Sequence, residues 1–305
     1  MTTPQHHGVS RRSFLKLSGL TALSVGGMTF LAACGPAAQD GGSAATTSAA
    51  SGTASAASAT LGDGKTLRVG MEAAYAPYNW QVSEESEYTI PIENVSGAYA
   101  DGYDVQAAKV IAKALGMEPV AVKSDFGALI DALNNGQIDI VCAGMSTTDE
   151  RKQSADFSDS YIDDDIVMIT KKDSKFASAT TFADLKGASV MGQADTMYDD
   201  VIAQIPDVNH MTPGKTVPTV VESLNSGTSD VITYSMLSVP KLLESYPDFV
   251  ELQMSDKFEG SVMPDNAAIA KGQDDILKKI NDAIATISAD ERQQMWNECM
   301  DRQPA

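Results

Sequence analysis

An arginine follows a small apolar segment and a serine in the stretch AGMSTTDERKQSADFSDSY, residues 143–161. Arg151 lies five residues after Ser146, where a buried-looking strand passes into a charged run. A run such as DERK is ordinarily a solvated surface. Arginine is nevertheless well suited to bind a carboxylate, because its planar fork donates two parallel hydrogen bonds and stays protonated. Arg151 is therefore a candidate anion-binding residue, with a solvated surface position as the alternative.

The residues between Ser146 and Arg151 carry further donors. Thr147 and Glu150 have the spacing of a capping box, which predicts a helix that begins here and offers free backbone N–H groups. Ser146 adds a hydroxyl group and its own N–H. A carboxylate that leaves water needs a charged partner and several such donors, so the segment has the composition of a carboxylate-binding loop.

Residues 1–33 have the features of an export signal rather than of a folded domain. Arg11 and Arg12 form a twin-arginine pattern in SRRSFLK, and an apolar stretch over 17–31 follows. This stretch has about 15 residues, fewer than the ~20 that a membrane-spanning helix needs, so an uncleaved anchor is the less favoured interpretation. It ends in LAAC, which resembles the lipobox of bacterial lipoproteins and implies lipidation of Cys34 and cleavage before it.

Residues 34–63 begin with that cysteine and continue almost entirely as Ala, Ser, Gly and Thr. Such a composition cannot bury a core and predicts a disordered tether. The leader holds three basic residues and no acidic one, so its removal changes the net charge from −19 to −22. A protein this acidic is not expected to bind nucleic acid or anionic lipid through its bulk surface. Cys142 and Cys299 are predicted to be unpaired thiols, because no zinc-binding spacing is present and folding before export does not require disulfides.

The remaining 240 or so residues alternate between strand and helix patterns. Repeated strand–helix–strand units predict an α/β fold with a mainly parallel sheet and helices on both faces. The strand patterns are 66–72, 118–123, 138–144, 166–172, 188–192, 208–212, 229–234, 249–254 and 266–272. The helix patterns are 103–116, 126–136, 197–205, 217–227, 236–246 and 274–300, the last with a break near Ser288.

These units form two similar halves that are joined around 162–166 and again around 255–260. The pattern predicts two lobes with a double hinge: 64–163 and 257–305 in the first lobe, and 164–256 in the second. Ligands bind at the carboxyl ends of strands in such sheets, so a cleft is expected between the lobes.

Two polar features are predicted to have no role in a metal site. The three consecutive aspartates at 163–165 are interpreted as a solvated hinge, because no cation-ligand spacing follows them. His210, the one histidine outside the leader, lies on a predicted strand with no partner. The segment 81–97 is longer than a tight connection needs, and its position is not predicted.

Four segments resemble the bacterial extracellular solute-binding proteins of family 3, which are amino-acid receptors of ABC importers. They are LRVGMEAAYAPYNW, GYDVQAAKVIAKALG, DFGALIDALNNGQIDIVCAGMSTTDERKQSADFSDSY and SLNSGTSDVITY. The resemblance covers essentially all of 64–305 and implies a two-lobed, type II periplasmic-binding-protein-like fold, the Venus flytrap, which closes on its ligand. It also implies an amino-acid or amino-acid-like ligand, an ABC permease as partner, a monomer and no cofactor.

The resemblance implies roles for residues of the segment 143–161. Arg151 would grip the α-carboxylate of the ligand, and the carbonyl group of Gly144 would accept a hydrogen bond from its ammonium group. Met145 and Ser146 would line the cleft beside them.

The other wall of the cleft is implied by MEAAYAPYNW and the segment at 125–136. Tyr75 and Phe126 match two aromatic residues that sandwich the side chain of the ligand, with ordinary core packing as the alternative. Glu72 matches an acidic position that reaches side-chain or amino groups in some members.

The sequence departs from the family pattern at two positions in the second lobe. QADT, residues 193–196, stands where the family often has Gln-x-Gly-Thr, so Thr196 keeps a hydroxyl group for the carboxylate but Asp195 replaces a glycine. The family also places an acid five residues after the position of Asp230, where it pairs with the ammonium group of the ligand. This chain has Ser235 there, and a hydroxyl group cannot replace the charge of a carboxylate.

Two explanations of Ser235 are open. Asp195 or Glu72 supplies the missing negative charge from another direction, or the ligand lacks a free α-ammonium group, as an acylated amino acid does. Two other function classes also stand as alternatives: a secreted enzyme on the same fold, similar to cyclohexadienyl dehydratases, and a sensor that presents its ligand to a receptor.

Overall fold

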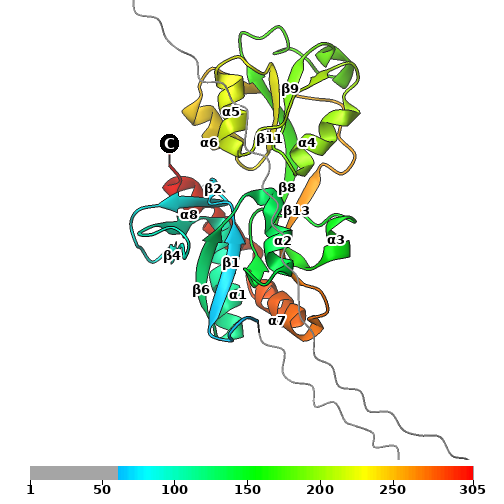
Figure 1. Ribbon diagram of the computed structural model, residues 1–305. Coiled ribbons are helices and arrows are strands. Elements are labelled where there is room, and N and C mark those ends of the chain that lie inside the picture. The colour runs from blue at the N-terminus through cyan, green and yellow to red at the C-terminus, as the bar shows by residue number, and fades with distance from the viewer. Residues whose placement is uncertain (1–60, 305) are drawn as a thin grey trace, which may run out of the picture. The chain divides into compact units, whose positions relative to one another are not determined.

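The computed structural model describes residues 61–304 (Figure 1). The predicted export signal, Cys34 and almost all of the predicted tether lie outside the described residues. Within 61–304, no helix is long and apolar enough to cross a membrane. Cys142 and Cys299 are both buried and unpaired, which confirms that prediction.

A nine-stranded sheet forms the centre of the fold. Eight of its strands follow the order β10-β9-β11-β8-β13-β7-β1-β6, and β12 pairs with β8 outside this path. Strand β1 pairs in parallel with β6 and β7, and β9 pairs in parallel with β10 and β11. The sheet therefore has a parallel group at each end, as the alternating pattern predicts, with antiparallel strands between them.

The first parallel group belongs to the first lobe. Its strands are β1 (Thr66–Met71), β6 (Glu118–Lys123) and β7 (Ile140–Val141). Its helices are α1 (Tyr103–Leu115), the 3-10 turn η1 (Phe126–Ala128), α2 (Leu129–Asn134), α7 (Asp274–Ala285) and α8 (Ala289–Arg302). The predicted break near Ser288 is confirmed, because the Ser288 hydroxyl and the Glu291 carboxylate form a capping box that begins α8.

A second, four-stranded sheet includes part of the segment that the sequence left unplaced. Its order is β2-β3-β5-β4. The strands are β2 (Ala74–Tyr75), β3 (Asn79–Val82), β4 (Ile90–Pro91) and β5 (Tyr99–Asp101). Residues 81–97 thus leave β3, form β4 and attach to the main sheet through a bridge between Ile92 and Ala121.

The second parallel group belongs to the second lobe. Its strands are β9 (Ser189–Met191), β10 (Asn209–His210), β11 (Val231–Ser235) and β12 (Phe249–Glu251). Its helices are η2 (Phe182–Leu185), α4 (Met197–Asp200), η3 (Val201–Gln204), α5 (Val217–Asn225) and α6 (Val239–Ser245).

Two long antiparallel strands, β8 (Ala155–Lys171) and β13 (Val262–Ala270), connect the two groups (Figure 1). Residues 155–165 of β8 pair with β13, whereas residues 166–170 pair with β11. Each strand starts earlier than its apolar pattern predicts, because polar residues of the connection also take part in the pairing.

The return to the first lobe also comes later than expected. Phe258 stacks on Phe182 with ring centroids 4.7 Å apart, and the backbone N–H of Glu259 donates to Gln204. Both contacts are with the second lobe. The predicted hinge at 255–260 therefore still belongs to that lobe, and β13 makes the crossing.

Candidate ligand-binding site

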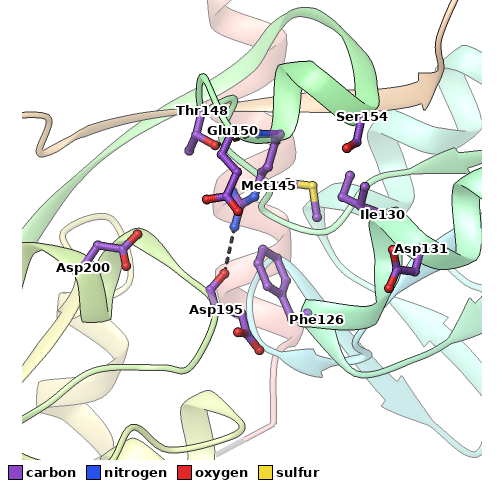
Figure 2. Close-up of a pocket in the computed structure, with 11 residues that line it drawn as sticks. Phe126, Ile130, Asp131, Met145, Thr148, Glu150, Ser154, Asp195 and Asp200 are labelled. Atoms are coloured by element: carbon purple, nitrogen blue, oxygen red, sulfur yellow. Dashed lines mark hydrogen bonds between the residues drawn. The ribbon is translucent and has the colours of Figure 1, made fainter.

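Arg151 is the first residue of a short helix, α3 (Arg151–Ser154), just before β8. Its Nη1 donates to the carbonyl oxygen of Ser146 at 2.8 Å, and its Nη2 donates to the carbonyl oxygen of Asp195 at 2.8 Å, the dashed line in Figure 2. The guanidinium carbon also lies 5.2 Å from the centroid of the Phe126 ring. Burial lowers the pKa of Arg151. One cation therefore links a loop of the first lobe to a loop of the second.

The predicted capping box before Arg151 is wrong. Helix α3 has only four residues and Glu150 flanks it, so Glu150 does not occupy the third helical position that a capping box requires. The hydroxyl group of Thr148 instead accepts from the Arg151 N–H at 3.1 Å. The turn thus holds the backbone of Arg151 through Thr148 rather than through Thr147.

An outer pocket of about 410 Å³, open to solvent, lies around the arginine. Figure 2 shows Asp195 and Asp200 on one side of it, and Phe126 and Asp131 on the other. Met145, one of the predicted site residues, lines this pocket. The full lining is Phe126, Gly127, Ile130, Asp131, Met145, Thr148, Glu150, Arg151, Ser154, Asp195 and Asp200.

An inner pocket brings together six of the predicted site residues from both lobes. Its free space is about 20 Å³, which is room for about one water molecule. The predicted residues in its lining are Tyr75, Phe126, Gly144, Ser146, Arg151 and Thr196. The other lining residues are Gln193, Met197, Tyr198 and Met263.

Tyr75 and Gly144 fit together at the wall of the inner pocket. Gly144 has φ 60°, and a Cβ atom there would lie 2.9 Å from Cε1 of Tyr75, so only glycine is accommodated. The Tyr75 ring stacks on Tyr78 with centroids 4.5 Å apart, and its hydroxyl lies 2.7 Å from that of Tyr198. Tyr75 is therefore packed on one side and faces the pocket and the second lobe on the other.

Asp195 adopts the conformation that a glycine would supply. Its φ is 62°, in the left-handed region that aspartate enters more readily than most residues. Its side chain is exposed and lies against Gly127, where an added Cβ would come within 2.3 Å of Asp195 Oδ2. Asp195 thus offers a carbonyl group to Arg151 and a carboxylate to the outer pocket.

Thr196 and Glu72 are both engaged with Gln193. The Thr196 hydroxyl donates to the Gln193 carbonyl at 2.7 Å, and the Gln193 amide donates to Glu72 Oε2 at 3.1 Å. Burial raises the pKa of Glu72, although the amide donor opposes this shift. Gln193 is therefore a second link between the lobes, with no role predicted from the sequence.

Ser235 is fully buried, at the end of β11. Its hydroxyl donates to the Ser238 hydroxyl at 2.9 Å and lies 3.4 Å from the hydroxyl of Tyr78. The Tyr78 hydroxyl in turn donates to Asp164 Oδ2 at 2.6 Å. The carboxylate linked to Ser235 through Tyr78 is thus Asp164 of β8.

The prediction of a solvated aspartate run is wrong for Asp164, which is buried and accepts from Tyr78 and from the Leu237 N–H at 3.0 Å. Burial raises its pKa. Asp164 is buried because β8 pairs with β13 and β11, and this pairing covers one face of the strand that connects the lobes. Three consecutive aspartates carry no local signal of this burial.

His210 also differs from its prediction. Its Nε2 lies 2.8 Å from Oδ1 of Asp199, so it has a partner on α4. Neither residue is among those that line the inner pocket. Among residues 61–304, no group of three or more His, Cys, Asp or Glu side chains is arranged to hold a metal ion.

Comparisons with known proteins agree with this architecture. The L-cystine-binding protein TcyJ of Escherichia coli (strain K12) is 28% identical, over 74% of this chain and 78% of that protein. The arginine-binding extracellular protein ArtP of Bacillus subtilis (strain 168) is 29% identical, over 72% of this chain and 80% of that protein.

Solved structures show the same fold. The substrate-binding protein of an amino acid ABC transporter superimposes with a TM-score of 0.66 at 28% identity, covering 78% of this chain and all of that one. An ancestral arginine-binding protein bound to arginine superimposes with a TM-score of 0.63 at 28% identity, covering 76% of this chain and 97% of that one. The predicted two-lobed, type II architecture is confirmed by these structures. Residues 67–298 match the sequence model of one family, and the chain therefore belongs to the bacterial extracellular solute-binding proteins, family 3.

Proposed function

We propose that this protein captures an amino acid or an amino-acid-like solute outside the cytoplasm and delivers it to the permease of an ABC importer. The observation that carries the proposal is the half-buried guanidinium group of Arg151, which lines a pocket formed by both lobes. The relatives named for cystine and arginine point to the same class of ligand.

The hydrogen bonds of Arg151 suggest how a ligand would act on the lobes. Its two terminal nitrogens now donate to neutral carbonyl groups, of Ser146 in one lobe and of Asp195 in the other. A ligand carboxylate is a stronger acceptor than a carbonyl group, because its negative charge attracts the guanidinium group and its two oxygens match the two parallel donors of the fork. A carboxylate held by Arg151 and by the N–H and hydroxyl groups near Thr196 would contact both lobes, and binding would favour the closed arrangement.

An enzyme of the cyclohexadienyl dehydratase type is the alternative from another class. It would need a general acid or base in reach of the substrate. The two carboxylates among the predicted site residues are engaged elsewhere: Glu72 accepts from Gln193, and Asp195 is exposed at the outer pocket. We therefore propose binding without turnover. Release of product from a prephenate-type acid would overturn this, and a partner receptor in place of a permease would favour the sensor alternative.

Anchoring at the membrane is part of the proposal. The twin-arginine pattern and the LAAC motif support export in a folded state and a lipid on Cys34, with the monomeric binding protein held at the extracytoplasmic face. The Cys34→Ser variant is expected to appear in the soluble fraction after export. Its retention in the membrane fraction would contradict the proposed anchor.

The function is tested by a thermal-shift screen of the full chain against free amino acids and their Nα-acetyl derivatives. A ligand at 1,000 times its Kd stabilises the native state by about 4 kcal/mol, which raises Tm by roughly 8 °C or more in a chain of this size. The Arg151→Ala variant is expected to lose this shift, because the carboxylate loses its charged partner. Arg151→Lys should retain a part of the shift, since it keeps the charge without the fork.

Lys186→Ala serves as the control, because Lys186 forms an exposed ion pair with Asp207 and neither residue lines the inner or the outer pocket. It should keep the full shift. An Arg151→Ala variant that is still stabilised as strongly as the native chain would overturn the role of Arg151. A native chain that responds to none of these compounds would overturn the proposed function.

A further inference from the structure

Asp265 is a buried acidic residue whose charge has no partner. It lies on β13, is 3% exposed, and its carboxylate makes no hydrogen bond with the described residues. Among these residues, the Thr147 hydroxyl is the only side-chain oxygen or nitrogen that is fully enclosed without a partner. The oxygens of Asp265, also without a partner, must therefore border free space.

The strand geometry shows which space this is. Side chains two residues apart on a strand point to the same face, so Asp265 shares a face with Met263, which lines the inner pocket. Asp265 also forms a bridge with Ser146, another residue of that lining. Asp164 lies directly opposite Met263 in the pairing of β8 with β13, on the same face. Asp265 is not itself among the residues that line the inner pocket, but it lies beside two that are, so the free space at its carboxylate adjoins this pocket.

The surroundings of Asp265 carry no compensating positive charge. Burial raises its pKa, and the charged groups that act on it, the carboxylates of Asp104, Asp164 and Asp163, raise it further. Asp164 has donors of its own in Tyr78 and the Leu237 N–H. A buried carboxylate without a partner is costly to the fold. A cation that enters the pocket would remove this cost.

The position of Arg151 indicates what else such a ligand carries. The carbonyl group of Ser146 accepts from Arg151, and the backbone of Ser146 is bridged to Asp265. Bridged residues have Cα atoms about 5 Å apart. The guanidinium group and the unpaired carboxylate thus belong to two residues that both contact Ser146. An α-amino acid carries its carboxylate and its ammonium group on one carbon, which matches this arrangement.

We propose that Asp265 is the counter-ion for the ammonium group of the ligand, in place of an acid at position 235, and that the protein therefore takes amino acids with a free, charged amino group. This inference rests on the proposed function and deepens it. It selects between the two explanations of Ser235: the negative charge is present, and it comes from the hinge strand β13 rather than from Asp195 or Glu72. Asp164, which is linked to Ser235 through the Tyr78 hydroxyl, adds to the negative potential around Asp265.

The test compares the native chain with Asp265→Asn by isothermal titration. The probes are the free amino acid that gives the largest thermal shift and its Nα-acetyl derivative. The variant is expected to bind the free amino acid at least about 30-fold more weakly, because asparagine keeps the shape but not the charge. The Nα-acetyl derivative should bind the native chain weakly and should not lose affinity in the variant.

Two controls separate binding from folding. The Tm of ligand-free Asp265→Asn should be equal to or above that of the native chain, because the variant removes an unpaired buried acid; a second variant, Asp265→Ser, should behave in the same way. Asp163 is an exposed acid of β8 that pairs with Pro264, the neighbour of Asp265. The affinity of Asp163→Asn for the free amino acid should differ from that of the native chain by no more than about twofold.

The outcomes are distinct. A native chain that binds free amino acids, with Asp265→Asn equally tight, overturns this inference and leaves the proposed function intact. A native chain that binds only Nα-acetyl derivatives also overturns the inference, because the ligand then has no ammonium group to pair. Binding of neither class overturns the proposed function itself.

Discussion

Two buried aspartates close to the binding loop differ in their hydrogen bonds. Asp104 is 0% exposed and Asp265 is 3% exposed. Asp104 accepts from the Tyr161 hydroxyl at 2.5 Å, the Asn79 amide at 2.7 Å and the Gly144 N–H at 3.2 Å. Asp265 accepts from no described residue. Equal burial therefore does not imply an equal role, and the hydrogen bonds of each carboxylate distinguish them.

The pKa values follow the same division. Burial raises the pKa of Asp104 to about 6, and its three donors oppose a larger shift. Burial and neighbouring carboxylates raise the pKa of Asp265 well above its ordinary value, and no donor opposes them. Asp104 joins α1, β3, β8 and the Gly144 loop, as a structural residue does. Asp265 remains unsatisfied until something enters the pocket.

The largest effect expected from this comparison is the loss of stability in Asp104→Asn. An amide in this place would turn one NH₂ group toward donors and leave buried groups unpaired, at a cost of about 3 kcal/mol. Tm should fall by roughly 6–12 °C for a domain of this size. Calorimetry of the ligand-free chain measures this, with Asp265→Asn as the matched control. Equal Tm values for Asp104→Asn and the native chain would remove the distinction between the two aspartates.

A smaller effect is expected in the pH dependence of Asp265→Asn. An acid whose pKa is raised on folding loses stability as the pH rises through its unfolded pKa, near 4, toward the folded value. The native chain should therefore lose stability relative to the variant above pH 4, by about 1 kcal/mol or more at pH 7. The nearby acids Asp104, Asp163 and Asp164 are present in both chains, so the gap measures the burial of the Asp265 carboxylate together with its repulsion by these acids. Urea unfolding at pH 4.5 and pH 7 measures this gap, and a gap that is the same at both values would contradict an unpaired Asp265.

The smallest effect is expected for Ser235→Asp. If Asp265 already pairs with the ammonium group, a carboxylate restored at position 235 gains little and adds repulsion to Asp164. The affinity for a free amino acid should then change by less than about threefold, or 0.7 kcal/mol. Titration calorimetry measures it, with Ser238→Ala as a control for the hydrogen bond between the two serines. A large gain in affinity would instead show that the ammonium site is incomplete without an acid there.

Much of the fold was predictable from local patterns. The apolar period of 103–115 and Gly116 defined α1, whose C-terminal cap is that glycine at φ 71°. Ser288 and Glu291 defined the start of α8. Elements of this kind depend on residues close in sequence, so spacing alone identifies them.

The site was predictable in its residue types but not in its contacts. Arg151, Ser146 and Thr196 were identified by the resemblance to the family, and the structure places them around one pocket. The capping box at Thr147 failed because one turn of helix is too short to contain it. Gln193 and Tyr198, the second-lobe residues that meet Glu72 and Tyr75, have no local signature of contact.

The sequence by itself determined the alternation of strands and helices, the acidic charge and the candidate arginine, because these depend on residue type and short spacing. Only the tertiary structure decided the role of the hinge acids. Asp164 and Asp265 are about 100 residues apart; Asp164 belongs to the run of three aspartates predicted to be solvated, and Asp265 directly precedes the predicted strand 266–272. They share one buried face only because β8 and β13 pair antiparallel in a particular register. That register is set by contacts across the whole sheet, which no local pattern contains.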